Sequence, residues 1–281
     1  MKLVAVICLL LLSACSVLSP SLMPIQGTLN KVSEKQRLCA ERLFRDQAAG
    51  IENLRILLSG EIKSEGRELP LLVVVVGERK GNLRVEFIRP AINQLESILL
   101  VNQGMITGFS VSKQTVCQEG TNEENFTSIL GLPLTAQELP LWVIGQFSLM
   151  QPADVQQSEN GSGKFLLTVP LSNHRLLKIL FSPDNPDLCQ AKYLHVTDSE
   201  IETEHYKLYS SYKYSTANHW PDELSIIIKR IDWEAKFIVS EVSSNGDFSN
   251  KRDKLFSFVM PRNVRYESCS QLAIDPLSAV R

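Results

Sequence analysis

The chain has 281 residues, of which 44% are hydrophobic and 21% charged. This mix is typical of a globular protein and unlike that of disordered, collagen-like or coiled-coil chains, and the length allows one large domain or two small ones. The formal net charge of −2, from 29 basic and 31 acidic side chains, leaves no overall basic field that would hold a nucleic acid.

The chain begins with a short apolar segment, residues 3–14, which follows Lys2 and reads LVAVICLLLLSA. This segment is too short to span a bilayer and is typical of the apolar core of a signal peptide. Residues 12–15, LSAC, resemble the bacterial lipobox. That resemblance implies cleavage before Cys15 and acylation of this cysteine. An ordinary signal peptide and a membrane-anchoring N-terminal helix are the alternatives.

These features predict three parts of the chain. They are a signal peptide over residues 1–14, a lipid-anchored tether over 15–30 and one folded domain over 31–281. Ser16 follows Cys15. In enterobacterial lipoproteins an Asp at this position resembles a signal that retains the protein in the inner membrane, and this chain has Ser there instead. We therefore expect the outer membrane, on its periplasmic face, with the acyl chains as the anchor.

Four cysteines remain for the folded domain: Cys39, Cys117, Cys189 and Cys269. An even number of cysteines in an oxidising compartment predicts at least one disulfide. Two disulfides would leave three connectivities open, and four buried free thiols are the alternative. The spacing is wide and contains no CxxC pair, which argues against a zinc site.

The first half of the domain shows one helical pattern followed by several strands. Residues 32–56 carry apolar side chains at steps of three and four and predict an amphipathic helix. Short apolar runs separated by tight turns then indicate an antiparallel meander. Its strands are expected at residues 57–65, 71–77, 83–88, 94–101 and 105–112.

Two short helices are expected in the middle of the chain. One covers residues 122–130, and the other starts at a capping box of Thr135 and Glu138 and is shortened or kinked by Pro140. Strands are then expected at residues 165–169, 175–182, 191–197, 201–214, 224–231, 234–242 and 254–259. This order predicts an α+β chain with one large, strongly curved antiparallel sheet of about eleven strands.

No catalytic or cofactor motif stands out. GxSxG, the Walker A loop, GxGxxG and HExxH do not occur. The four histidines, at positions 174, 195, 205 and 219, have no spacing that a metal site would need. We therefore expect a protein that is not an enzyme and that has no metal and no cofactor.

Several short motifs resemble, in their order and spacing, the LolB family of outer-membrane lipoproteins. They are Gly60-Glu61-Ile62, Leu132-Pro133, residues 139–145 (LPLWVIG) and residues 220–226 (WPDELSI). Members of this family receive other lipoproteins from the periplasmic carrier LolA. The resemblance implies an incomplete antiparallel β-barrel, with helices that cover its open side and an apolar cavity for acyl chains.

The resemblance also implies a function and site residues. The expected function is binding of lipid or lipoprotein acyl chains, with a LolA-like carrier as a partner and no nucleic acid. Candidates for the cavity lining are Phe87, Phe109, Trp142, Trp233 and Phe237; the alternative for each of them, favoured for any single residue, is that it fills a core. Ile92, in the stretch 89–93, is the candidate for a membrane-transfer loop. The alternative is a structural or assembly lipoprotein that uses the same fold as an interaction scaffold in an envelope machine.

Overall fold

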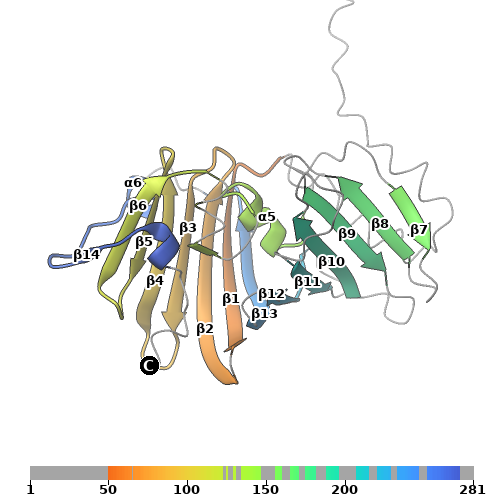
Figure 1. The fold of residues 1–281 in the computed structure, drawn as a ribbon, viewed down its shortest axis with the longest axis horizontal. Helices are drawn as coiled ribbons and strands as arrows, with labels where there is room; N and C mark the ends of the chain where they lie inside the picture. Colours follow the sequence, from red (N-terminus) through yellow and green to blue (C-terminus); the bar gives the residue numbers. More distant parts are fainter. Residues whose placement is uncertain are drawn as a thin grey trace, which may run out of the picture. The chain divides into compact units, whose positions relative to one another are not determined.

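A single open sheet dominates the structure, a computed structural model (Figure 1). The structure describes residues 50–64, 66–122, 125, 129–130, 134–146, 156–159, 165–170, 175–181, 188–195, 207–214, 220–228, 233–246 and 252–272. Its strands are β1 (Asn53–Ser64), β2 (Arg67–Glu78), β3 (Leu83–Arg89), β4 (Gln94–Asn102), β5 (Met105–Ser110), β6 (Thr115–Gly120), β7 (Gln156–Glu159), β8 (Phe165–Pro170), β9 (Arg175–Phe181), β10 (Leu188–His195), β11 (Lys207–Lys213), β12 (Glu223–Ile228), β13 (Trp233–Ser244) and β14 (Arg265–Tyr266). The helices are α5 (Glu138–Val143), α6 (Arg252–Leu255) and α7 (Cys269–Leu272).

The strands follow the order β14-β6-β5-β4-β3-β2-β1-β13-β12-β11-β10-β9-β8-β7. Every neighbouring pair is antiparallel except β14 and β6, which run parallel. β14 and β7 form the two edges and do not pair with each other, so the sheet is open. The predicted α+β chain with one open, largely antiparallel sheet is confirmed, with fourteen strands among the described residues in place of about eleven.

The centre of the sheet is the long hairpin of β1 and β2. Its two strands pair without a break from Asn53↔Glu78 to Ser64↔Arg67, because the run of valines and leucines favours extended chain. Side chains alternate between the two faces of a strand. We call inner the face that carries Ile56 and Val75, and outer the opposite face.

Some of the predicted elements differ from the structure. The predicted helix 32–56 is wrong at its end, since residues 53–56 start β1 and pair with residues 75–78 of β2; residues 32–49 lie outside the described residues. Strands β6, β7 and β14 were not predicted. Within the predicted helix 122–130, the structure describes helical conformation at residues 125, 129 and 130.

The predicted strand 254–259 is also wrong, because this part of the chain lies on the sheet and not within it. Its first residues belong to α6, and Phe256 packs on the outer face against Val76 and Leu100. The ring of Phe258 lies 5.2 Å from that of Phe109. We call residues 252–272 the C-terminal clasp.

The clasp continues around the edge of the sheet. Its two-residue strand β14 pairs with β6, and α7 then lies on the inner face, where Leu272 packs over Gly108. A disulfide joins Cys269 of α7 to Cys117 of β6, which confirms the prediction of at least one disulfide. Of the other two candidates, Cys39 lies outside the described residues, and Cys189 belongs to β10.

No helix in the described part of the chain is both long and apolar enough to cross a membrane.

Candidate functional site

The inner face of the sheet is a continuous apolar surface. From β5 across to β12 its side chains alternate with those of the outer face and are almost completely buried. The set includes Leu54, Ile56, Leu58, Ile62, Leu71, Val73, Val75, Leu83, Val85, Leu99, Ile106, Leu224, Ile226 and Phe237. At about 25 cal/mol for each Å² of apolar surface removed from water, this face is the main apolar contribution to folding.

Helix α5 covers part of this face. Thr135 and Glu138 form the predicted capping box: the Thr135 N–H donates to Glu138 Oε2 (2.8 Å), and the Glu138 N–H donates to Thr135 Oγ1 (3.2 Å). The five residues from Leu139 to Val143 are all buried, so the helix is apolar on every side. Pro140 lies in the first turn of the helix and packs directly on Gly77 of β2.

The other end of α5 is held by β11. The Tyr212 hydroxyl donates to the carbonyl oxygen of Trp142 at 2.7 Å. Gly145 has a φ of +69°, a conformation that glycine adopts without strain, and its backbone lies against Tyr212 and Tyr214. The helix therefore connects β2 with β11 across the inner face.

The hydrogen bond from Tyr212 gives a first prediction. Burial raises the pKa of its phenol well above the usual value, so the folded state keeps the phenol protonated. Tyr212→Phe is expected to lose about 1 kcal/mol of stability near neutral pH. Because the folded pKa is raised, the contribution of the phenol is complete below its unfolded pKa of about 10 and is lost as the pH rises above it.

Urea unfolding near neutral pH and above pH ~10 measures both effects. Near neutral pH the wild type should have the larger free energy of unfolding, and this difference from the variant should disappear at the higher pH. If the difference in the free energy of unfolding between the two proteins does not change with pH, the buried phenol is not the cause of the loss of stability at alkaline pH.

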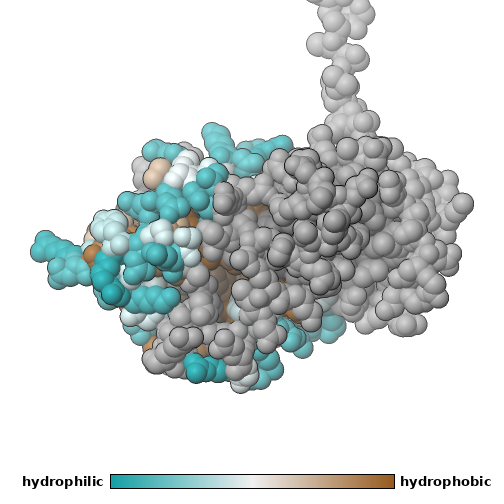
Figure 2. All heavy atoms as spheres, viewed as in Figure 1, coloured by the Kyte–Doolittle hydropathy of each residue, from teal (hydrophilic) through white to brown (hydrophobic). Residues whose placement is uncertain are grey.

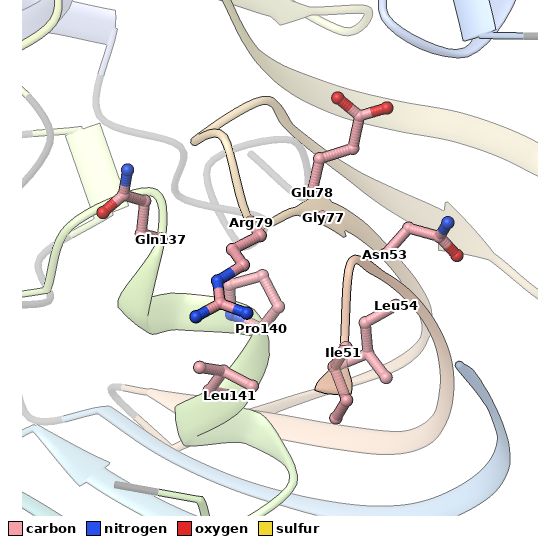
Figure 3. A pocket seen from close by; sticks show the side chains of 9 residues that line it. All are labelled: Ile51, Asn53, Leu54, Gly77, Glu78, Arg79, Gln137, Pro140 and Leu141. Carbon is pink, nitrogen blue, oxygen red and sulfur yellow. The ribbon is translucent and has the colours of Figure 1, made fainter. Parts of the chain in front are cut away.

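Two small cavities lie beside the start of α5. One, of about 30 Å³, is lined by Ile51, Leu54, Gly77, Arg79, Pro140 and Leu141, together with Asn53, Glu78 and Gln137 (Figure 3). The other, of about 260 Å³, lies among the β2–β3 and β4–β5 turns, and its lining includes Lys80, Gln103, Thr121 and Gln137. Both fall below the roughly 300–1,000 Å³ that is usual for ligand pockets.

Four of the five predicted lining residues lie on the inner face or in the helix that covers it. Trp142 of α5 is 1% exposed, and Phe237 of β13 lies over Gly60 with an exposed fraction of 3%. Phe87 and Trp233 are half-buried on the same face.

The fifth candidate, Phe109, lies on the outer face under the clasp. The membrane-transfer candidate, Ile92, is 58% exposed at the tip of the β3–β4 hairpin. Hydrophilic side chains form most of the surface of the described residues that is visible in Figure 2, with hydrophobic ones set deeper.

One buried polar group of this site lacks a partner among the residues that the structure describes. The indole N–H of Trp142 is buried and donates no hydrogen bond to any of them, at a usual cost of about 1–3 kcal/mol. Tyr212, which donates to the same residue, was not predicted from the sequence as part of the site. Its only sequence signal is the alternation of Ser210, Tyr212 and Tyr214 along β11.

No family model and no curated protein matches the chain, whereas several solved structures have a similar fold. A LolA superfamily protein from Nitrosomonas europaea is 11% identical, with a TM-score of 0.47 over 79% of this chain and 97% of its own. A Vibrio parahaemolyticus domain, whose name relates it to outer membrane lipoprotein sorting, is 10% identical, with a TM-score of 0.48 and the same two coverages. A DUF1329 family protein from Desulfovibrio piger is 12% identical, with a TM-score of 0.46 over 79% of this chain and 100% of its own.

Proposed function

We propose that this chain is a lipid-anchored protein of the bacterial outer membrane that binds acyl chains of a lipid or lipoprotein on the inner face of its sheet. One observation supports the proposal above the others. The apolar inner face of an open sheet is covered by a six-residue apolar helix, α5, that packs on two distant strands. An acyl chain offers the same kind of contact as the helix it would displace.

The energies make this exchange feasible. Burial of an acyl chain contributes about 0.8 kcal/mol for each CH₂ group, or on the order of 10 kcal/mol for a long chain. In its covering position α5 leaves the Trp142 indole N–H without a hydrogen bond to any described residue. The helix is also short, and Pro140 lies within it. Displacement of α5 exchanges one set of apolar contacts for another and requires no covalent chemistry.

The location rests on the N-terminal sequence. The lipobox-like residues 12–15 provide a site of acylation at Cys15. In this arrangement the signal peptide ends at residue 14, residues 15–30 form the tether, and a LolA-like periplasmic carrier delivers the cargo. Cargo would then pass from the carrier to this protein and on to the bilayer without nucleotide hydrolysis.

Replacement of Cys15 tests the anchor. Cys15→Ala is expected to abolish incorporation of a radioactive fatty acid, because the thiol that carries the lipid is gone, and to leave an unprocessed or soluble periplasmic form. Labelled cells that express the wild type or the variant are compared on gels. Equal label in both proteins would exclude Cys15 as the attachment site.

Native mass spectrometry of the unlipidated protein tests the binding function. We expect phospholipid or an acylated peptide to copurify with it and to dissociate at higher collision energy. A mass that corresponds to protein alone, together with no uptake of a fluorescent fatty acid, would exclude acyl-chain binding.

A scaffold role is the second candidate, and a specific observation favours it. In the described part of the chain the inner face is already filled, with Trp142 1% exposed and Leu224 0% exposed. A scaffold needs no open cavity, and side chains can permanently fill its core. The two functions differ in whether α5 leaves its place.

A further inference from the structure

The clasp disulfide narrows the pairing of the other cysteines to one possibility. It joins Cys117 to Cys269, so neither of these two can bind another thiol. The sequence has six cysteines in all, and the proposed signal peptide and lipid anchor account for one each. Cys39 and Cys189 are then the two thiols that remain in the exported chain.

The strand register places Cys189 on the inner face of the sheet. Cys189 pairs with Tyr212 of β11, and Tyr212 pairs with Leu224 of β12. Leu224 in turn pairs with Phe237 of β13, which lies over Gly60 of β1. Residues that are directly opposite in an antiparallel pair stand on the same face. Cys189 therefore continues a row that crosses the inner face from β1 to β10.

The predicted N-terminal helix directs the other thiol to the same face. Its apolar stripe runs through Phe44 to Ile51, and Cys39 flanks this stripe. Ile51 is 8% exposed and lies with Leu54 of β1 and Leu141 of α5 around the smaller cavity (Figure 3). The stripe thus ends between β1 and the helix that covers the inner face.

The chain from Cys39 to β1 is long enough to reach Cys189. β10 is four strands from β1, about 19 Å across the sheet, and the row meets β1 at Gly60, about 23 Å along the strand from Asn53. The distance is then on the order of 30 Å on a flat sheet, and curvature shortens it. A helix up to residue 50, extended chain from there to Asn53 and the bond itself span roughly 32 Å.

We infer that Cys39 and Cys189 form a second disulfide, which ties the N-terminal segment across the inner face to β10. A bond forms between the two Sγ atoms. The two protons and two electrons that the thiols lose pass to the disulfide of a periplasmic thiol oxidant, which becomes a dithiol. The inference rests on the proposed function only for its oxidising compartment and does not depend on acyl binding.

The second bond gives each half of the open sheet its own covalent tie. The clasp disulfide holds the C-terminal end of the chain at β6, in the half that ends at β14. The bond at Cys189 holds the N-terminal segment at β10, in the half that ends at β7. It also connects the lipid tether to β10, because residues 15–30 lead into the segment that carries Cys39.

Peptide mapping of the wild-type lipoprotein, extracted from membranes in detergent, tests the pairing. The protein is denatured with an alkylating reagent, digested with trypsin without reduction and analysed by mass spectrometry. We expect residues 38–42 (LCAER) to be linked to residues 179–192 (ILFSPDNPDLCQAK) in a species that separates on reduction. The clasp bond is the internal control, since it links residues 114–164 to residues 266–281.

Variants show whether the two thiols bind each other. Cys39→Ala should expose Cys189 to the reagent, and Cys189→Ala should expose Cys39, so that each chain changes from no alkylated thiol to one. The double variant should again have none. Cys117→Ala is the matched control, because it exposes Cys269 and should leave residues 38–42 linked to residues 179–192.

Alkylated peptides 38–42 and 179–192 beside an intact clasp bond would overturn the inference and leave the proposed function standing. Dimers that dissociate on reduction and contain either peptide would overturn it as well. If the clasp peptides are alkylated too, the chain has not met an oxidising compartment, and the proposed location fails together with the inference. Linked peptides in a protein that takes up no fluorescent fatty acid support the bond and exclude acyl binding alone.

Discussion

Replacing Cys117 and Cys269 together by alanine is expected to lower the free energy of unfolding by roughly 2–5 kcal/mol. The disulfide joins residues 152 positions apart in the sequence, so the unfolded chain gains much freedom when it is lost. The folded state also loses the tie that keeps α7 on the inner face, where Leu272 packs over Gly108. The double variant leaves no unpaired thiol at this place that could form a wrong disulfide.

Urea unfolding of the oxidised proteins measures this difference. Val259→Ala is the control within the same clasp, because Val259 is 89% exposed and its truncation should change stability by no more than about 0.5 kcal/mol. If the double cysteine variant is as stable as this control, the clasp does not constrain the fold.

The second large effect is expected at Gly60, the glycine of the Gly60-Glu61-Ile62 motif. A Cβ atom at this position would collide with the Lys236 carbonyl oxygen and would lie 2.8 Å from Phe237 Cα. Both are backbone atoms of β13, so no side-chain rotation can relieve the contact. Gly60→Ala should therefore separate β1 from β13 locally and cost roughly 3 kcal/mol.

Gly120→Ala provides the matched control for this substitution. Gly120 also lies in a strand, but a Cβ there meets no atom within 4 Å, and a change of no more than about 0.5 kcal/mol is expected. Thermal unfolding followed by circular dichroism compares the two. Equal stabilities would show that β13 can accommodate a methyl group at Gly60.

Strands can be predicted from the sequence where apolar side chains alternate along a short segment. The prediction fails for a segment whose packing partners are distant in the sequence. Phe256 and Phe258 stand two residues apart, as side chains on one face of a strand do. Their segment lies on the sheet because side chains take the place of a neighbouring strand: the Arg84 guanidinium donates to the carbonyl oxygens of Leu255 and Ser257, and the Asn102 amide donates to that of Phe256. No local pattern shows which donors a backbone will meet.

The local features of the candidate site were also predictable from the sequence, whereas the features that depend on strand register and on the fold were not. The capping box of Thr135 and Glu138 identifies the start of α5, since both partners lie within four residues. The face on which a strand residue lies depends on register, because a shift of one residue moves every side chain to the other face. For this reason Phe109 and Trp142 were both predicted to line one cavity, although they lie on opposite faces of the sheet. The contact of Tyr212 with α5 depends on the fold and has no local sequence signal.

Binding of a fluorescent fatty acid to the Gly77→Ala protein tests the central claim most directly. A methyl group at Gly77 would collide with the ring of Pro140 and should destabilise the covering position of α5 by about 1–3 kcal/mol. If α5 covers the acyl site, the open state becomes more populated and the apparent affinity rises by about five- to a hundredfold. Gly120→Ala should bind like the wild type. Affinity that is unchanged or weaker in a folded Gly77→Ala protein would contradict the account.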